Sequence, residues 1–129
     1  MNIFFCGDTH GRPADTDKLS NKNWKEQKEL TKEDVLIQLG DFGWIWYEFG
    51  INKEQEFWLD NLAARKYTLA IVPGNHENYN IINNLPIEDK WGAPVRVLTR
   101  KTGVIYFLER GYVYLINGKI GRASCRERV

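Results

Sequence analysis

The chain has 129 residues, and its composition is that of a globular domain: 43% of the residues are hydrophobic, 27% are charged and 13% are aromatic. This balance excludes a disordered chain, and no uncharged apolar run approaches the roughly 20 residues that span a bilayer. The N-terminus carries no secretory signal, and two cysteines are too few for a disulfide framework. We therefore expect a cytoplasmic protein that does not bind membranes.

The last ten residues, 120–129, differ from the rest of the chain in their sequence pattern. They follow neither strand nor helix periodicity, and written back into codons they resemble a common sequencing-library adapter; a genuine basic tail is the alternative. We expect residues 1–119 to be part of a larger domain, an N-terminal fragment, followed by a non-native tail. Without that tail the net charge is −1 instead of +1, which predicts no electrostatic attraction to nucleic acid.

The first half of the chain predicts three buried strands, at residues 2–6, 35–39 and 68–72. Each is a short apolar run that breaks into polar turn residues, in the order Gly-Asp, Gly-Asp and Pro-Gly-Asn. Residues 13–30 predict a surface helix with an irregular end. Strands alternating with helices are typical of α/β folds.

A second helix is predicted at residues 52–66. Asn52 can cap it and Gln55 can complete a capping box. Its core-facing stripe is expected to contain four apolar residues, and basic residues at its end suit the helix dipole; these are Phe57, Trp58, Leu62 and Ala63, then Arg65 and Lys66.

The second half changes from alternation to antiparallel strands. Residues 78–85 predict a short helix, and residues 95–98, 104–108 and 112–116 predict short strands. Asn-Gly after the last strand signals a hairpin, of which we expect most of the second arm to be missing. The whole pattern predicts a mixed α/β architecture.

The three strand ends carry residues that can bind a metal. In an open α/β sheet, ligands bind just outside the carboxyl ends of the strands. Asp8 and His10 are one residue apart, so an extended backbone turns both side chains to one side, where they can hold a divalent cation. Asp41 adds a carboxylate that can bridge two cations, and Asn75 adds an amide oxygen. This set suits Mn²⁺, Fe or Zn²⁺, although each residue could instead form a turn or bond the backbone.

The motifs together resemble the calcineurin-like metallophosphoesterase superfamily, and in particular a bacterial and phage branch. The family is marked by D-x-H, G-D and G-N-H-[DE], which match residues 8–10, 40–41 and 74–77. The spacings of 33 residues from Asp8 to Asp41 and of 34 from Asp41 to Asn75 are also similar. The resemblance covers residues 1 to about 119.

The resemblance implies a calcineurin-like α-β-β-α sandwich, with mixed sheets flanked by helices, and a binuclear metal centre. It implies that Asp8, His10, Asp41 and Asn75 are metal ligands. It also implies that His76 is the catalytic proton or hydrogen-bond donor, and that Glu77 orients His76 without binding the metal. Full-length members continue to a lone His and a G-H-x-H motif, and neither follows His76 here. We therefore expect two divalent ions in the parent protein and at most one weakly bound ion in this fragment.

The function that follows is hydrolysis of phosphate mono- or diesters through a water activated by two metals, with the fragment itself inactive. The alternative is a catalytically dead phosphoesterase fold that acts as a protein-binding scaffold. Arg12 can contact a substrate phosphate or can be a solvated loop residue. The expected partner is a phosphate-ester substrate, so nucleic acid enters only as a substrate, and the sequence does not specify the oligomeric state.

Overall fold

The computed structural model describes residues 3–7, 24–39, 53–73, 79–109, 112–116 and 119–122. The mixed α/β architecture predicted from the sequence is confirmed, since helices alternate with strands at first and strands follow one another later. In chain order the elements are β1 (Ile3–Cys6), the 3-10 helix η2 (Lys25–Glu29), β2 (Val35–Leu39), α2 (Lys53–Ala63), β3 (Thr68–Val72), α3 (Tyr79–Ile82), β4 (Ile87–Lys90), β5 (Ala93–Arg100), β6 (Gly103–Leu108), β7 (Val113–Ile116) and β8 (Lys119–Arg122).

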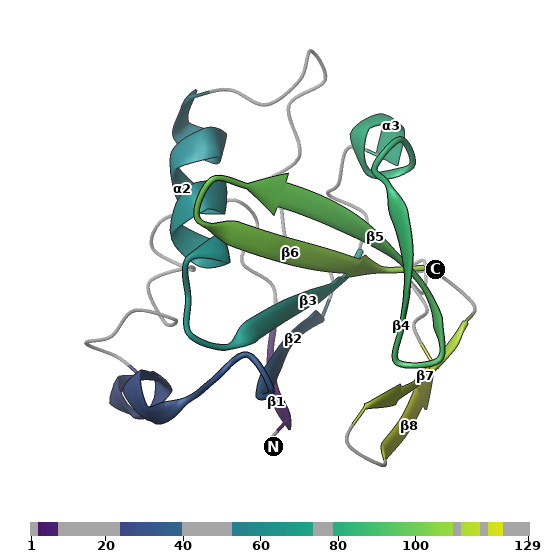
Figure 1. The fold of residues 1–129 in the computed structure, drawn as a ribbon, viewed down its shortest axis with the longest axis horizontal. Helices are drawn as coiled ribbons and strands as arrows, with labels where there is room; N and C mark the ends of the chain where they lie inside the picture. The colour runs from purple at the N-terminus through teal and green to yellow at the C-terminus, as the bar shows by residue number, and fades with distance from the viewer. Residues whose placement is uncertain are drawn as a thin grey trace.

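Six strands form one mixed sheet in the order β1-β2-β3-β6-β5-β4 (Figure 1). The first four in this order run parallel, whereas β5 is antiparallel to both of its neighbours. The strands predicted at 2–6, 35–39 and 68–72 are thus present as β1, β2 and β3, side by side. Because Cys6 pairs with Gln38 and Leu39 pairs with Val72, their carboxyl ends reach the same edge of the sheet.

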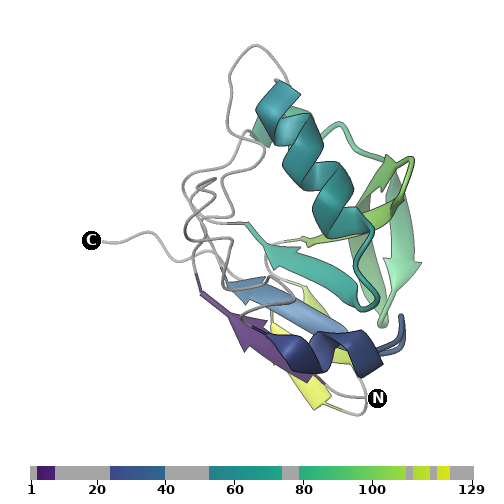
Figure 2. The same ribbon diagram turned by 90° about the vertical axis from the view of Figure 1, so that its left-hand side faces the viewer.

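The sheet lies between two layers that cover opposite faces (Figure 2). On one face α2 packs against β3, β5 and β6 over a core that includes Leu59, Leu69 and Phe107. On the other face β7 contributes Tyr114 and Ile116 to a second core. The strands β2 and β3 are buried at four of five positions, as expected for parallel strands covered on both sides.

Helix α2 lies inside the predicted range 52–66 but ends at Ala63. Its buried apolar residues, Leu59, Leu62 and Ala63, follow helical spacing and face the sheet. Phe57, predicted for this stripe, is instead 63% exposed. The physical reason is that two residues correspond to about 200° of rotation, which places Phe57 on the far side of the helix from Leu59.

The remaining elements agree with the prediction except in one place. The short helix and the later strands are present as α3, β5, β6 and β7, whereas β4 was not predicted. Three of its four residues are exposed, so it has no apolar pattern. It forms by pairing with β5 across a tight turn at Trp91 and Gly92, whose φ angles are 56° and 82°. Of the predicted helix at 13–30, the described part holds only η2, and the predicted cap Asn52 lies outside the described residues.

The hairpin of β7 and β8 corrects a second expectation. Its second arm is formed, because Ile120 pairs with Leu115 and Arg122 with Val113. Three residues of the predicted tail, 120–122, therefore lie in β8. Main-chain groups of almost any sequence can form such a ladder, so the pairing leaves the proposed origin of residues 120–129 as a prediction.

Candidate functional site

Three chain segments leave the sheet together at the carboxyl edge of the parallel strands. The described chain reaches this edge at Gly7 after β1, at Leu39 in β2 and at Pro73 after β3. Neighbouring strands are about 4.8 Å apart, so the three exits span about 10 Å. An edge of this width can be covered by one small polar site.

The residues predicted for that site all lie outside the described residues. The structure therefore describes the strands that lead to them, and neither brings the site side chains together nor separates them. Their roles remain predictions from the sequence; the residues are Asp8, His10, Arg12, Asp41, Asn75, His76 and Glu77.

One buried polar residue at this edge was missed by the sequence analysis. Gln38 is 1% exposed, and its Nε2 donates a hydrogen bond of 2.5 Å to the carbonyl oxygen of Gly7. The bond joins the end of β2 to the residue that follows β1. A lone glutamine between Ile37 and Leu39 in an otherwise apolar strand was the signal that could have found it.

The chain that follows α3, at Leu85 and Pro86, is anchored to β5. After α3, the carbonyl oxygen of Leu85 accepts a bond of 2.9 Å from Arg96 Nη1, and that of Pro86 accepts one of 2.9 Å from the Val97 amide. Arg96 is itself held by an ion pair with Glu109 just after β6. The chain that follows the Gly-Asn-His-Glu motif is therefore fixed to the sheet by one cation and two backbone carbonyls.

A second hydrogen-bond network, at the end of β6, joins β7 to the ends of β5 and β6. The buried phenol of Tyr114 donates to the Pro94 carbonyl oxygen at 2.5 Å and accepts from the Glu109 amide at 2.7 Å. Burial raises the pKa of Tyr114 above its usual value. The neutral phenol both donates and accepts a hydrogen bond, and in this way it holds β7 against the ends of β5 and β6.

The opposite, amino edge of the strands collects basic residues around main-chain carbonyls. Lys32 Nζ donates to the carbonyl oxygens of Ala63, Arg65 and Tyr67 at 3.5, 2.6 and 3.0 Å. The ammonium thus caps the carboxyl end of α2, the role that the sequence predicts for Arg65 and Lys66. Partial burial lowers the pKa of Lys32 from its ordinary value.

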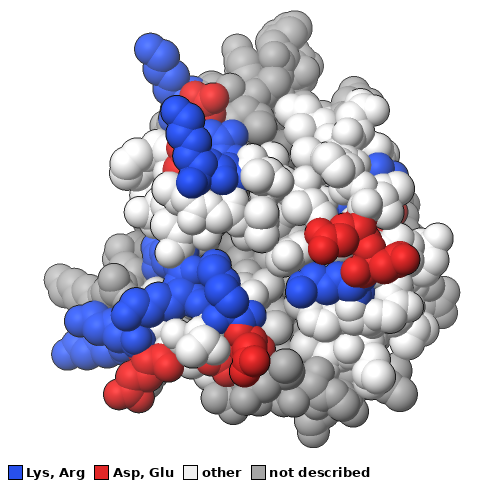
Figure 3. Space-filling view, viewed as in Figure 1, with Lys and Arg blue, Asp and Glu red and all other residues white. Residues whose placement is uncertain are grey.

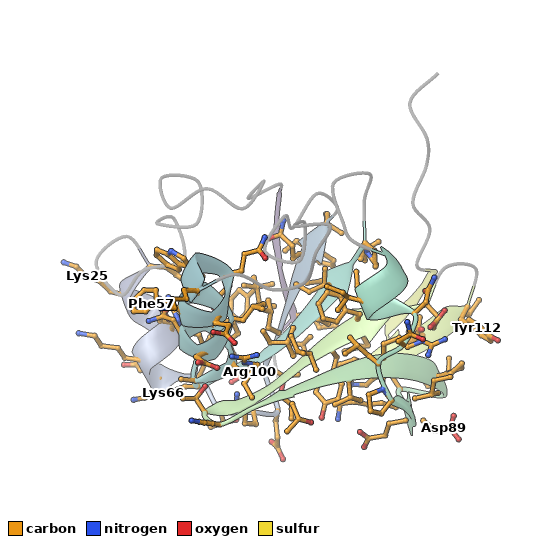
Figure 4. All side chains as sticks on the ribbon, turned by 90° about the horizontal axis from the view of Figure 1, so that it is seen from above. Lys25, Phe57, Lys66, Asp89, Arg100 and Tyr112 are labelled. Carbon is orange, nitrogen blue, oxygen red and sulfur yellow. The ribbon has the colours of Figure 1, made fainter. Side chains whose placement is uncertain are left out.

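The basic residues of this edge gather on one side of the molecule. Lys66 Nζ reaches the carbonyl oxygen of Lys28 at 3.0 Å, which brings the segment after α2 against η2. Blue side chains cluster at the lower left of Figure 3, and Figure 4 shows Lys25 and Lys66 at one end of the molecule, with Asp89 and Tyr112 at the other.

The donor set of the sequence motifs fits a divalent cation, since two carboxylates, an imidazole and an amide oxygen are ligands of Mn²⁺, Fe and Zn²⁺. Within the part of the chain that the structure describes, no three His, Cys, Asp or Glu side chains form such a group. The metal-binding hypothesis therefore rests on the residues that follow β1, β2 and β3 in the sequence.

Comparison with known protein families gives a match to most of the chain. The family model described as calcineurin-like phosphoesterase matches residues 1–124. The chain belongs to this family, and the resemblance found in its motifs is confirmed. Neither the curated proteins nor the solved structures contain a match to the chain.

Family membership supports a phosphoesterase-type function in general, and the family implies a phosphate-ester substrate. The family generally uses divalent metals. In the described ranges, every helix is too short or too polar to cross a membrane.

Proposed function

We propose that the carboxyl edge of β1, β2 and β3 carries the active site of a metal-dependent phosphoesterase. The observation that supports it most is the register of the three strands, which end side by side. Asp8 comes one residue after Gly7, Asp41 two residues after Leu39, and Asn75 two residues after Pro73. Since each residue adds at most 3.8 Å of chain, all three can reach a common centre.

In this proposal Asp8, His10 and Asp41 hold one divalent cation, and Asp41 and Asn75 contribute to a second. Mn²⁺, Fe or Zn²⁺ bound there would polarise the phosphoryl oxygens and lower the pKa of a nearby water. Asp41 is the shared ligand because a carboxylate has two oxygens and a charge that offsets two cations, whereas an amide has neither.

The other motif residues act on the substrate. We propose that His76 donates a proton or a hydrogen bond to the oxygen of the leaving group as the ester bond breaks. Glu77 holds the imidazole in the orientation that this transfer needs. Arg12 contacts a non-bridging phosphate oxygen, for which a guanidinium is well shaped. The substrate class is a phosphate mono- or diester.

The test is hydrolysis of an activated aryl phosphate by the full-length parent protein, with and without added Mn²⁺. Asp41→Asn should lower turnover by a factor of at least about 100, because the shared ligand loses its charge. The matched control is Thr68→Val, which removes a buried hydroxyl at the opposite edge of the sheet, where Thr68 Oγ1 bonds the Lys32 carbonyl oxygen. Wild-type turnover in Asp41→Asn at saturating metal would exclude Asp41 as a ligand.

We also propose that residues 120–129 are encoded by adapter DNA and that the parent protein has a different sequence there. The support is the codon match, which runs through all ten residues. Sequencing the locus from independently prepared DNA should replace the Arg-rich string by other residues. Recovery of the same ten codons would show that the tail is native.

A further inference from the structure

Gln38 is a buried amide whose contact lies at the boundary between the sheet and the proposed site. It is the fourth residue of β2, and its Cα partner across the ladder is Cys6, the last residue of β1. Its side chain passes this last pair and bonds the carbonyl oxygen of Gly7 at 2.5 Å. The contact between the two strands is thereby extended by one residue in the direction of Asp8.

The energetic cost of this arrangement points to a role other than packing. A buried amide is unfavourable unless it is hydrogen-bonded, and an apolar side chain of similar length would fill the same place in the core without that requirement. The bonded carbonyl belongs to Gly7, which is exposed, so water could take the place of Gln38 there. Besides occupying its place in the core, Gln38 joins the end of β2 to Gly7, the residue that follows β1, which an apolar side chain could not do.

We infer that Gln38 is a positioning residue of the proposed metal site, which sets the course of the chain from Gly7 into Asp8 relative to β2 and hence relative to Asp41. The inference rests on the proposed function. Gln38 itself touches neither metal nor substrate in this account. Partners that orient metal ligands in this way typically affect metal affinity by about 10-fold to 100-fold.

Gly7 offers a control within the same contact. A Cβ built on Gly7 would meet no atom within 4 Å, so the position does not need glycine for lack of space. Gly7→Ala keeps the carbonyl oxygen that Gln38 bonds. If the bond to the Gly7 carbonyl positions the metal site, Gly7→Ala leaves the affinity for Mn²⁺ unchanged, whereas replacement of Gln38 lowers it.

The experiment is a titration of the 129-residue chain with Mn²⁺ alone, in which free Mn²⁺ is counted by electron paramagnetic resonance. Gln38→Met should raise the Kd for Mn²⁺ by about 10-fold or more, and Gln38→Leu should do the same if the Met variant does not fold. Gly7→Ala should stay within about two-fold of the wild type. Thr68→Val, which also loses a buried side-chain bond to a carbonyl, should lower the melting temperature without changing the Kd.

The outcomes separate the two hypotheses. If the wild type binds Mn²⁺, Asp41→Asn weakens that binding and the folded Gln38 variants do not, the metal site stands and the positioning role is wrong. An equal weakening in Thr68→Val would also overturn it, because the effect would then follow stability alone. If the wild type binds no Mn²⁺ at millimolar concentrations, the positioning role is overturned as well, and aryl-phosphate hydrolysis by the parent protein then decides the proposed function separately.

Discussion

The two ends of the same parallel strands use polar residues in different ways. At the amino edge the polar groups end on main-chain atoms: Lys32 bonds three carbonyl oxygens, and Thr68 Oγ1 bonds the carbonyl oxygen of Lys32 at 2.5 Å. At the carboxyl edge the strands lead into Asp8, Asp41 and Asn75, whose side chains are potential metal ligands.

The difference shows that a cluster of charge at a sheet edge is not by itself a functional site. At the amino edge, Lys32 is explained by the carbonyls at and after the end of α2, which attract cations, and Lys66 by the carbonyl of Lys28 in η2. The acidic and imidazole residues that follow β1, β2 and β3 in the sequence are of the types that bind divalent metals. The two ends of the strands therefore differ in the types of their polar residues and in the place of those residues in the chain, and charge alone does not distinguish them.

The largest change in stability is expected for Tyr114→Phe, which tests a structural contact at the carboxyl end of β6. The variant leaves the Pro94 carbonyl and the Glu109 amide without their buried partner, and it should lower the free energy of unfolding by about 1–3 kcal/mol. Urea unfolding at pH 7 measures this loss. A weaker affinity for Mn²⁺ in the folded variant would show that the metal site extends to β7. The Tyr114 contact would then not be separate from the metal site.

The same variant has a predicted pH signature. Because burial raises the pKa of Tyr114, its contribution to stability is fully present below about pH 10 and is lost as the pH rises through the folded-state pKa. The wild type should therefore lose stability more steeply in alkali than Tyr114→Phe. Parallel unfolding curves for both proteins between pH 9 and about pH 11 would contradict the assignment.

A smaller effect is expected for Lys32→Met at the amino edge. Only the bond to the Arg65 carbonyl is exposed, whereas Ala63 and Tyr67 are buried residues whose carbonyls lose a partly buried partner. The free energy of unfolding should therefore fall by about 1 kcal/mol. Metal affinity should not change, since the ammonium caps α2 and lies at the far end of the strands. Thermal unfolding and Mn²⁺ titration of the same sample check both statements, and a changed Kd would argue against separate roles for the two edges.

The smallest effect is expected for Asp60→Asn. Arg100 Nε bonds Asp60 Oδ1 at 2.6 Å, and this bond holds the pKa of Asp60 below its ordinary value. The pair therefore contributes stability above about pH 4 that is lost as the pH falls through the lowered pKa. The ion pair is partly exposed, so salt screens part of its attraction, and Asp60→Asn should only make acid unfolding slightly less steep. An acid midpoint that does not move at low salt would contradict this contribution.

The sequence predicted the parallel strands well because burial on both faces requires continuous apolar runs, as in residues 35–39 and 68–72. It failed at β4, whose exposed residues carry no pattern and which depends on pairing with β5. It also placed the end of α2 too late, because the cation that caps the helix, Lys32, comes from a segment about 30 residues earlier in the chain. Contacts of this kind cannot be derived from local periodicity.

The site divides in the same way. Motif order and spacing predicted the family, which the family match confirms, because a ligand set must recur at the ends of adjacent strands. The individual roles of Asp8, His10, Asp41 and Asn75 remain predictions, since those residues lie outside the described ranges. The sequence marks Gln38 as a lone polar residue in an apolar strand, but its partner could not be predicted, because the hydrogen bond depends on the register between β1 and β2.

The most direct test of the two-edge account is Mn²⁺-induced broadening of backbone amide signals in the 129-residue chain, because paramagnetic broadening falls steeply with distance. At substoichiometric Mn²⁺, the amides of Gly7, Leu39 and Val72 at the carboxyl edge should broaden first, while those of Lys32 and Thr68 at the amino edge should stay sharp. Broadening that begins at Lys32 and Thr68, or that spares Gly7 and Leu39, would contradict a metal site at the carboxyl ends of the strands.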